Sequence, residues 1–203
     1  LSDLADLGTV MGNVYHTKDD MIDCVNAFYE GMVTRSEEMK LHPNYRTGKN
    51  YAYLGLAPQF LIFDEYVAFL EMLTTKESTA LLSQLKKIVM LGRQAGYFLI
   101  VACQRPDAKY FGDGIRDNFN FRVGLGRISE LGYGMLFGSD VKKQFFQKRI
   151  KGRGYCDVGT SVISEFYTPL VPKGHDFLQI IGSLAQARQD GTATCEAKGD
   201  GTD

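Results

Sequence analysis

The stretch Tyr97–Cys103 constrains the fold of this 203-residue chain more than any other, because it is apolar at every position. A strand that is continuously apolar is typical of the centre of a parallel sheet, where both faces are covered. Shorter strand patterns and amphipathic helix patterns accompany it: strands at 59–63, 121–125 and 161–167, and helices at 18–40, 66–74 and 77–93. Strands that alternate with helices predict an α/β fold, with a parallel sheet and helices on both faces.

The remaining segments predict loops and an unstructured end. Residues 1–16 are expected to form the end of a strand and a loop, and 43–57 and 151–160 are predicted loops. The last residues turn to Gly, Thr, Ala, Asp and Lys without periodicity, which is typical of disorder. We therefore expect one domain over 1–185 and a disordered tail over 186–203.

The formal net charge of −1 excludes the strongly basic field of a stand-alone nucleic-acid-binding protein. Any contact with DNA must therefore use a local patch. The longest apolar run, Tyr97–Cys103, is far shorter than the roughly 20 residues of a bilayer span. The start of the chain does not resemble a signal peptide. The chain itself is expected to be a cytoplasmic domain without direct membrane contact.

Cysteine and histidine spacing argues against a metal site or disulfides. No two cysteines form a CxxC pair, so all are expected to be reduced thiols: Cys24, Cys103, Cys156 and Cys195. The three histidines are also far apart in the sequence: His16, His42 and His175.

Two adjacent carboxylates, Asp64 and Glu65, follow directly on the apolar strand pattern at 59–63. In α/β sheets, ligands bind at the carboxyl ends of the strands. Because neighbouring side chains point in different directions, Asp64 can hold the water shell of Mg²⁺ while Glu65 faces an attacking water. This is the Walker-B arrangement of ATPases, in which the metal neutralises phosphate charge. The alternative is a strand end with two solvated acids.

Two further groups are candidates for nucleotide chemistry. Gln104 follows the apolar run at once, where its amide can contact the γ-phosphate of ATP or orient water; alternatively, Gln104-Arg105-Pro106 is simply a polar turn. Arg93 lies at the end of the helix predicted at 77–93. A cation there suits the helix dipole, or it is an arginine supplied to the ATP of a neighbouring subunit.

A basic stretch is the candidate DNA contact. Six cations occur within twelve positions: Lys142, Lys143, Lys148, Arg149, Lys151 and Arg153. They are able to face DNA phosphates. The alternative is a solvated helix face, with the intervening Phe145 and Phe146 packed inward.

Taken together, the motifs resemble the FtsK/SpoIIIE family of hexameric DNA-pumping ATPases. They occur in the family's order within residues 5–160: Asp64-Glu65, G-R-x-x-G at 92–96, Q-R-P at 104–106, Asn118-Phe119-x-x-Arg122 and Gly152-Arg153-Gly154. The segment looks most like the coupling proteins of conjugative elements of Gram-positive bacteria.

The resemblance implies a RecA-like fold of the ASCE type of P-loop NTPase, with ATP and Mg²⁺ as cofactors. It also implies roles for four residues. Asp64 would order Mg²⁺, Glu65 would polarise the attacking water, Gln104 would sense the γ-phosphate, and Arg93 would complete a neighbour's site in trans. The implied partners are DNA, further copies in a ring, and conjugation or secretion machinery, with the parent protein anchored in the bacterial cell membrane.

Two departures from the family pattern matter. No G-x-x-x-x-G-K-[ST] phosphate-binding loop occurs, and Gly48-Lys49-Asn50 is its nearest imitation. In the family this Walker A loop lies one helix and one strand upstream of the matching segment, so we expect an N-terminally truncated fragment that is inactive alone. In addition, Arg122 and Arg127 are five positions apart where the family usually has four, so Arg127 is assigned no role.

Two other functions stay open on the sequence. Related ATPases of type VII secretion move proteins rather than DNA. A degenerate domain without a phosphate-binding loop could instead serve as a non-enzymatic assembly module.

Overall fold

The computed structural model describes residues 3–105, 107–111, 115–138, 141, 144–145, 150–160 and 162–189. The chain divides into two compact units, of which the larger is Thr17–Leu170. The smaller combines Leu1–His16 with Val171–Asp203. The extent of the domain predicted for 1–185 stays a prediction.

The larger unit contains a parallel pair of strands, β1 (Gln59–Phe63) and β2 (Tyr97–Val101). In their register, Gln59 lies opposite Tyr97 and Phe63 lies opposite Val101. The connection between them contains α2 (Tyr66–Glu71) and α3 (Thr75–Ala95), as parallel strands require a crossover. The predicted α/β class is confirmed.

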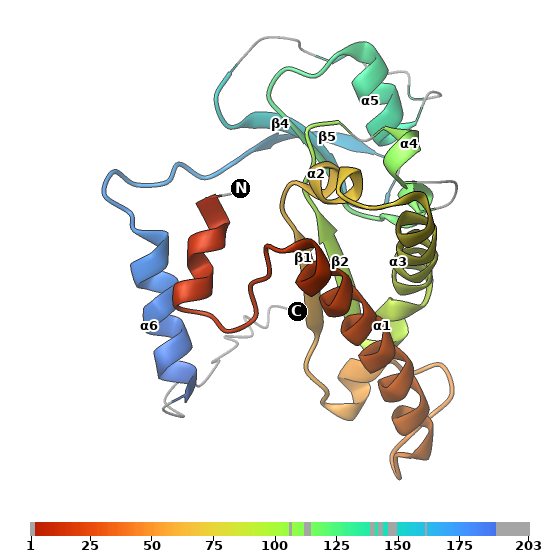
Figure 1. Ribbon diagram of the computed structural model, residues 1–203. Coiled ribbons are helices and arrows are strands. Elements are labelled where there is room, and N and C mark those ends of the chain that lie inside the picture. Colours follow the sequence, from red (N-terminus) through yellow and green to blue (C-terminus); the bar gives the residue numbers. More distant parts are fainter. Residues whose placement is uncertain are drawn as a thin grey trace, which may run out of the picture. The chain divides into compact units, whose positions relative to one another are not determined.

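One face of this pair is covered by α3 and by α1 (Lys18–Leu41), which lie alongside it in Figure 1. The side chain of Thr17 accepts a hydrogen bond from the backbone N–H of Asp20 and thereby caps the start of α1. The buried core joins both helices to both strands, and its members include Val25, Met32, Leu61, Phe63, Leu85 and Ile88.

The opposite face of the pair carries large apolar side chains that are exposed. Phe60 is 55% exposed, Ile62 is 63% exposed and Ile100 is 47% exposed. Side chains alternate along a strand, and the alternate set is the one that packs against α1 and α3. The prediction that the run Tyr97–Cys103 is buried on both faces is therefore wrong for this chain.

A second sheet in the larger unit is antiparallel, in the order β3-β4-β5. Its strands are β3 (Arg122–Leu125), β4 (Arg153–Asp157) and β5 (Ile163–Tyr167). The strands predicted at 121–125 and 161–167 thus exist, but they do not join the parallel pair.

Strand β4 corrects the loop predicted at 151–160. It forms because it pairs on both edges, with β3 and with β5, and because Tyr155 is buried. The Tyr155 ring packs edge-on against Tyr133 of α5 (Glu130–Phe137), with ring centroids 5.8 Å apart. A separate small core therefore holds this sheet together.

The smaller unit corrects the expected strand and loop at 1–16, because Asp3–Thr9 forms the 3₁₀ helix η1. Helix α6 (Phe177–Gln189) runs into the start of the predicted tail, and 190–203 lie outside the described residues. Short helices complete the chain: η2 (Tyr51–Leu54), α4 (Ala108–Phe111) and η3 (Arg116–Asn118). Among the helices described, none is both long and apolar enough to cross a bilayer.

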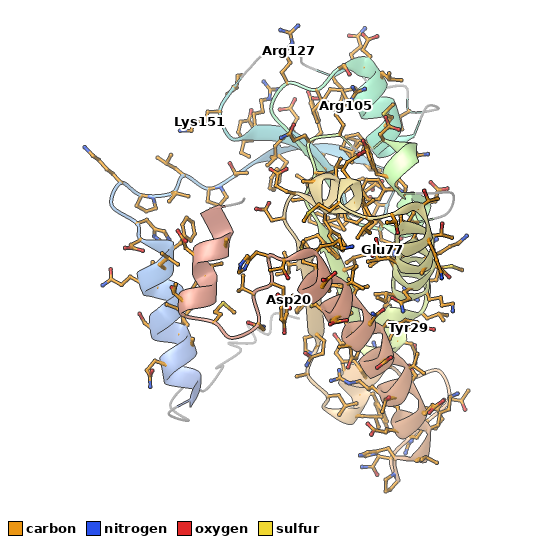
Figure 2. The ribbon with its side chains drawn as sticks, in the orientation of Figure 1. Asp20, Tyr29, Glu77, Arg105, Arg127 and Lys151 are labelled. Carbon is orange, nitrogen blue, oxygen red and sulfur yellow. The ribbon has the colours of Figure 1, made fainter. Side chains whose placement is uncertain are left out.

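An ion pair fastens the start of α1 to the start of α3, where Figure 2 labels Glu77. The Lys18 ammonium nitrogen is 2.8 Å from Glu77 Oε1. Glu77 also completes the capping box of α3 with Thr74. The hydrogen bond from Lys18, followed by those from Thr74, lowers the pKa of Glu77 from 4.5 to about 2.

We expect the carboxylate of Glu77 to make the free energy of unfolding depend on pH. A group whose pKa is lowered by folding stabilises the fold above its ordinary pKa of 4.5, and that contribution is lost as pH falls towards 2. A Glu77→Gln variant should therefore be less stable than the wild type at pH 7, and the gap should close between pH 4.5 and 2. Urea unfolding, monitored by circular dichroism across this pH range, measures the stability of the variant and of the wild type. Glu38→Gln, at an exposed site on α1, is the control; a Glu77→Gln gap that is constant with pH would contradict the assignment.

Candidate functional site

The carboxyl ends of β1 and β2 are tied together beyond the regular ladder. The backbone N–H of Ala102 donates to the carbonyl of Phe63 at 2.8 Å, and the N–H of Tyr66 donates to the carbonyl of Ala102 at 3.1 Å. Asp64 and Glu65 lie between these two bonds in sequence. The two carboxylates are therefore held beside the end of β2.

Gln104 lies just beyond this end of β2, at the same edge of the sheet as Asp64 and Glu65. All three residues are exposed. The structure thus brings together the three groups to which sequence assigned the metal, the attacking water and the γ-phosphate. It does so at the edge where parallel sheets bind ligands.

Glu65 has a left-handed backbone conformation, with φ 59° and ψ 45°. Among the described residues it is the sole residue other than glycine with positive φ. Such a conformation costs about 1–3 kcal/mol and persists where the surroundings enforce it, often at functional sites. It turns the chain sharply from β1 into α2, so the Glu65 side chain leaves the backbone in a different direction from that of Asp64.

Buried aromatic side chains enforce this turn. The Phe63 ring stacks on that of Phe69, with centroids 5.5 Å apart, and meets the Tyr66 ring edge-on at the same distance. Tyr66 is only 1% exposed, and its hydroxyl donates to the carbonyl of Tyr110 at 3.1 Å. No prediction from the sequence assigned Tyr66 a part in the site.

Cys103 directly precedes Gln104 and interacts with the charge of Glu65, and no prediction from the sequence assigned it a part in the site. Burial raises the pKa of its thiol, a hydrogen bond from the backbone of Arg105 lowers it, and the charge of Glu65 raises it. Burial, followed by the charge of Cys103, raises the pKa of Tyr66. At neutral pH both groups are therefore uncharged.

The edge suits a magnesium ion held mainly by its nucleotide. The described residues contain no group of three or more His, Cys, Asp or Glu side chains that could hold a metal. Mg²⁺ usually keeps several waters and takes one or two carboxylates plus substrate phosphates rather than an all-protein cage. An exposed Asp64 fits that requirement.

Arg93 is not part of this edge. It lies in the last turn of α3, which Gly96 ends in a left-handed conformation at φ 79°. The carbonyl of Gly96 accepts from the N–H of Gln59 at 2.7 Å, so this turn lies at the amino ends of both strands. Strands of five residues separate the two edges by about 13 Å. Within one copy of the chain, Arg93 is remote from Asp64, Glu65 and Gln104.

The glycines around Arg93 have structural explanations. A Cβ at Gly92 would lie 2.2 Å from the carbonyl oxygen of Tyr97. A Cβ at Gly96 would lie 2.5 Å from the Tyr51 ring. Gly92 thus allows α3 to end close against β2, and Gly96 leaves room for the Tyr51 ring of η2. Packing therefore explains the two glycines of the G-R-x-x-G motif, but it does not explain why an arginine occupies position 93.

Arg122, of the N-F-x-x-R motif, supports its own surroundings. Its Nε donates to the carbonyl of Phe119 at 2.8 Å, and its Nη1 donates to the carbonyl of Leu136 at 3.1 Å. The second bond places a cation at the C-terminal end of α5, where the helix dipole favours it. Arg127 is exposed.

The predicted basic stretch is only partly described. Four of its members lie outside the described residues: Lys142, Lys143, Lys148 and Arg149. Lys151 is exposed, and Figure 2 labels it at one end of the antiparallel sheet. The Arg153 side chain is only 15% exposed, and its Nη2 is 2.9 Å from Glu165 Oε1. Arg153 therefore stabilises the antiparallel sheet through this ion pair between β4 and β5.

Arg35 is a further structural residue that the sequence did not single out. Its Nη1 donates to the carbonyl of Ala57 at 2.8 Å, and its guanidinium lies 4.7 Å from the centre of the Tyr97 ring. It fastens α1 to the loop before β1 and to the start of β2. An arginine on a helical face carries no sequence signal that distinguishes this contact from solvation.

Comparison with known proteins gives one strong sequence match, although no family model matches the chain. The chain is 52% identical over all 203 residues to the FtsK domain-containing protein YdcQ of Bacillus subtilis (strain 168). It spans 42% of that relative's length.

Two solved structures are similar in fold, each matching 80% of this chain. The cytoplasmic domain of the type VII secretion ATPase EccC of Thermomonospora curvata has a TM-score of 0.60 at 20% identity, over 19% of that chain. The pCW3 conjugation coupling protein TcpA, a monomer with ATPγS, has a TM-score of 0.58 at 18% identity, over 49% of that chain. At these identities the likeness shows the fold alone, and the predicted RecA-like α/β fold is confirmed. The match to YdcQ over every residue of this chain confirms the predicted resemblance to FtsK-domain proteins.

Proposed function

We propose that the chain is part of an ATP-driven motor that moves DNA through a ring of identical subunits, in the transfer of DNA by a conjugative element. The observation that carries this proposal is the edge formed by Asp64, Glu65 and Gln104, with Glu65 held in a strained turn beside β2. Similarity to an FtsK-domain protein and a fold shared with a conjugation coupling protein support it.

At this edge, each side chain has a distinct part in hydrolysis. Mg²⁺, when bound with ATP, neutralises phosphate charge. Asp64 orders the water shell of that ion. Glu65 accepts a proton from the attacking water, and the amide of Gln104 donates a hydrogen bond to the γ-phosphate. Arg93 acts on the nucleotide of the neighbouring subunit, which its distance from its own edge favours.

The phosphate-binding loop is proposed to lie in a part of a longer protein outside this chain. The relative's greater length supports this. The 203-residue chain alone should then bind ATP only very weakly, because backbone N–H groups and a lysine of such a loop normally hold the phosphates. Calorimetry with ATP and Mg²⁺ tests this, and a micromolar dissociation constant would show instead that the chain has its own nucleotide site.

DNA contacts are proposed for the basic stretch around Lys151. Its other proposed members are Lys142, Lys143, Lys148, Arg149 and Arg153. The ion pair with Glu165 makes Arg153 the weakest of these candidates. The ring is proposed to be a hexamer on the cytoplasmic side of a membrane that anchors the longer protein.

A second function, movement of a protein substrate, is supported by the fold shared with the secretion ATPase EccC. The longer protein discriminates between the two. A DNA motor should hydrolyse ATP faster when single-stranded or duplex DNA is added. ATP hydrolysis that is indifferent to DNA would favour a protein substrate. An absence of hydrolysis in every condition would favour an assembly module.

A further inference from the structure

A loop at the amino edge of the parallel pair, the edge at which Arg93 also lies, contains none of the residues assigned to the ATP chemistry. The loop 42–58 joins α1 to β1 and contains η2. Because β1 begins at Gln59, the loop lies at the amino edge of the strands. Figure 1 shows it at the end of β1 remote from α2.

Several contacts hold the loop in place. The Tyr51 ring packs over Gly96 so closely that an added Cβ there would lie 2.5 Å from it. The side-chain amide of Gln94 donates to the carbonyl of Lys49. The bond from Arg35 to the carbonyl of residue 57 fastens the end of the loop. These contacts thus hold the backbone of the loop, and with it the side chains between them, in a fixed position.

This loop carries an exposed aromatic ring, that of Tyr53, with two cations beside it. Tyr53 is 43% exposed. The Lys49 ammonium is 5.6 Å from the centre of its ring, and the Arg46 guanidinium is 6.0 Å from it. Both cations are exposed, where such contacts are weak. The fold therefore gains little from the arrangement, which leaves the exposed part of the ring and two positive charges available to a ligand.

The sequence around this ring is positive, although the chain as a whole is not. No carboxylate occurs between Glu38 and Asp64, while this stretch contains Lys40, Arg46 and Lys49. Positive groups beside an exposed aromatic ring are the combination that binds a phosphate backbone with its bases unstacked.

We infer that Tyr53, with Lys49 and Arg46, is a stacking site for single-stranded DNA. A base lies on the Tyr53 ring, and the two cations contact the phosphates on either side of that nucleotide. Duplex DNA does not fit, because its bases already stack on one another. The inference rests on the proposed function, since it takes DNA as the cargo, and it adds both a place of contact and a preference for the unpaired strand.

The chain contains no tryptophan, which makes the contact directly observable. A Tyr53→Trp variant of the 203-residue chain has a single indole at the proposed site. Its fluorescence should be quenched by a short oligothymidylate, through base stacking. An abasic oligonucleotide with the same number of phosphates should not quench it. Tyr15→Trp is the matched control, because Tyr15 is 46% exposed, close to the exposure of Tyr53, and it should not respond.

Affinity measurements separate stacking from charge. Tyr53→Ala should weaken oligothymidylate binding about tenfold, the effect of losing one base stack. Lys49→Ala and Arg46→Ala should each reduce the salt dependence of binding by about 0.7 in the slope of log K against log salt. Lys76→Ala, at an exposed site on α3, is the charge control. Binding of duplex DNA should be unchanged by Tyr53→Ala.

The outcomes distinguish this inference from the proposed function. DNA binding that is equally strong in Tyr53→Ala would overturn the stacking site and leave the DNA motor intact. A wild-type chain that binds neither single-stranded nor duplex DNA would count against both. Quenching of Tyr53→Trp by polyglutamate as strong as by oligothymidylate would show a site for acidic peptides and would overturn the assignment to DNA.

Discussion

Replacing Glu65 with Gln is expected to lower ATP turnover by the longer protein about 10²–10⁴-fold, the usual cost of losing one general base. The amide keeps the size of the side chain but accepts no proton from water. ATP should stay bound, because Glu65 contacts the water rather than the phosphates. Single-turnover hydrolysis with bound nucleotide measured separately tests both statements.

Two variants sharpen this result. Asp64→Ala should change the dependence on Mg²⁺, since its partner is the ion. Glu37→Gln, at an exposed site on α1, controls for the loss of a negative charge. Hydrolysis by Glu65→Gln at the wild-type rate would remove Glu65 from the chemistry and leave its strained backbone unexplained.

Replacing Arg93 with Ala is expected to abolish activity through the neighbouring subunit. An arginine that stabilises charge on the transferring phosphoryl group contributes about 10³–10⁵ in rate in other nucleotide hydrolases. A purely structural Arg93 would instead contribute about 0.3–1 kcal/mol of stability through the dipole of α3. Its separation from the carboxylates of its own chain, by the length of β1 and β2, favours the first role.

Mixing two inactive proteins decides between the roles. Arg93→Ala and Glu65→Gln subunits should form rings in which some interfaces pair an intact Glu65 with an intact Arg93 of the neighbour. Recovery of part of the ATPase activity on mixing supports action in trans. An Arg93→Ala protein that hydrolyses ATP normally and melts a few degrees lower would leave the structural role alone.

The sequence predicts the carboxylate edge well because strong local signals specify it. An apolar run ending in Asp64 defines β1, and Gly96 defines the end of α3 before β2. The left-handed turn at Glu65 has no such signal, because glutamate does not favour that conformation. The burial of the neighbouring Tyr66, among side chains that are distant in the sequence, imposes it.

Strand β4 escapes prediction for a related reason. Its sequence from Arg153 to Asp157 contains a glycine and no β-branched residue, and it follows a left-handed Gly152. Pairing on both edges, which is not local information, makes it a strand. The antiparallel arrangement of β3 is likewise decided by its partner rather than by its own residues.

The exposed face of β1 and β2 affects how an oligomer of this chain should be interpreted. Phe60, Ile62 and Ile100 form an apolar surface that two copies in solution can bury against each other. A pair joined by the same patch on both partners is closed by a twofold axis and cannot grow, whereas a ring needs two different patches that meet head to tail. A dimer of the isolated chain would therefore show that this apolar face associates with itself, and it would give no information about ring assembly.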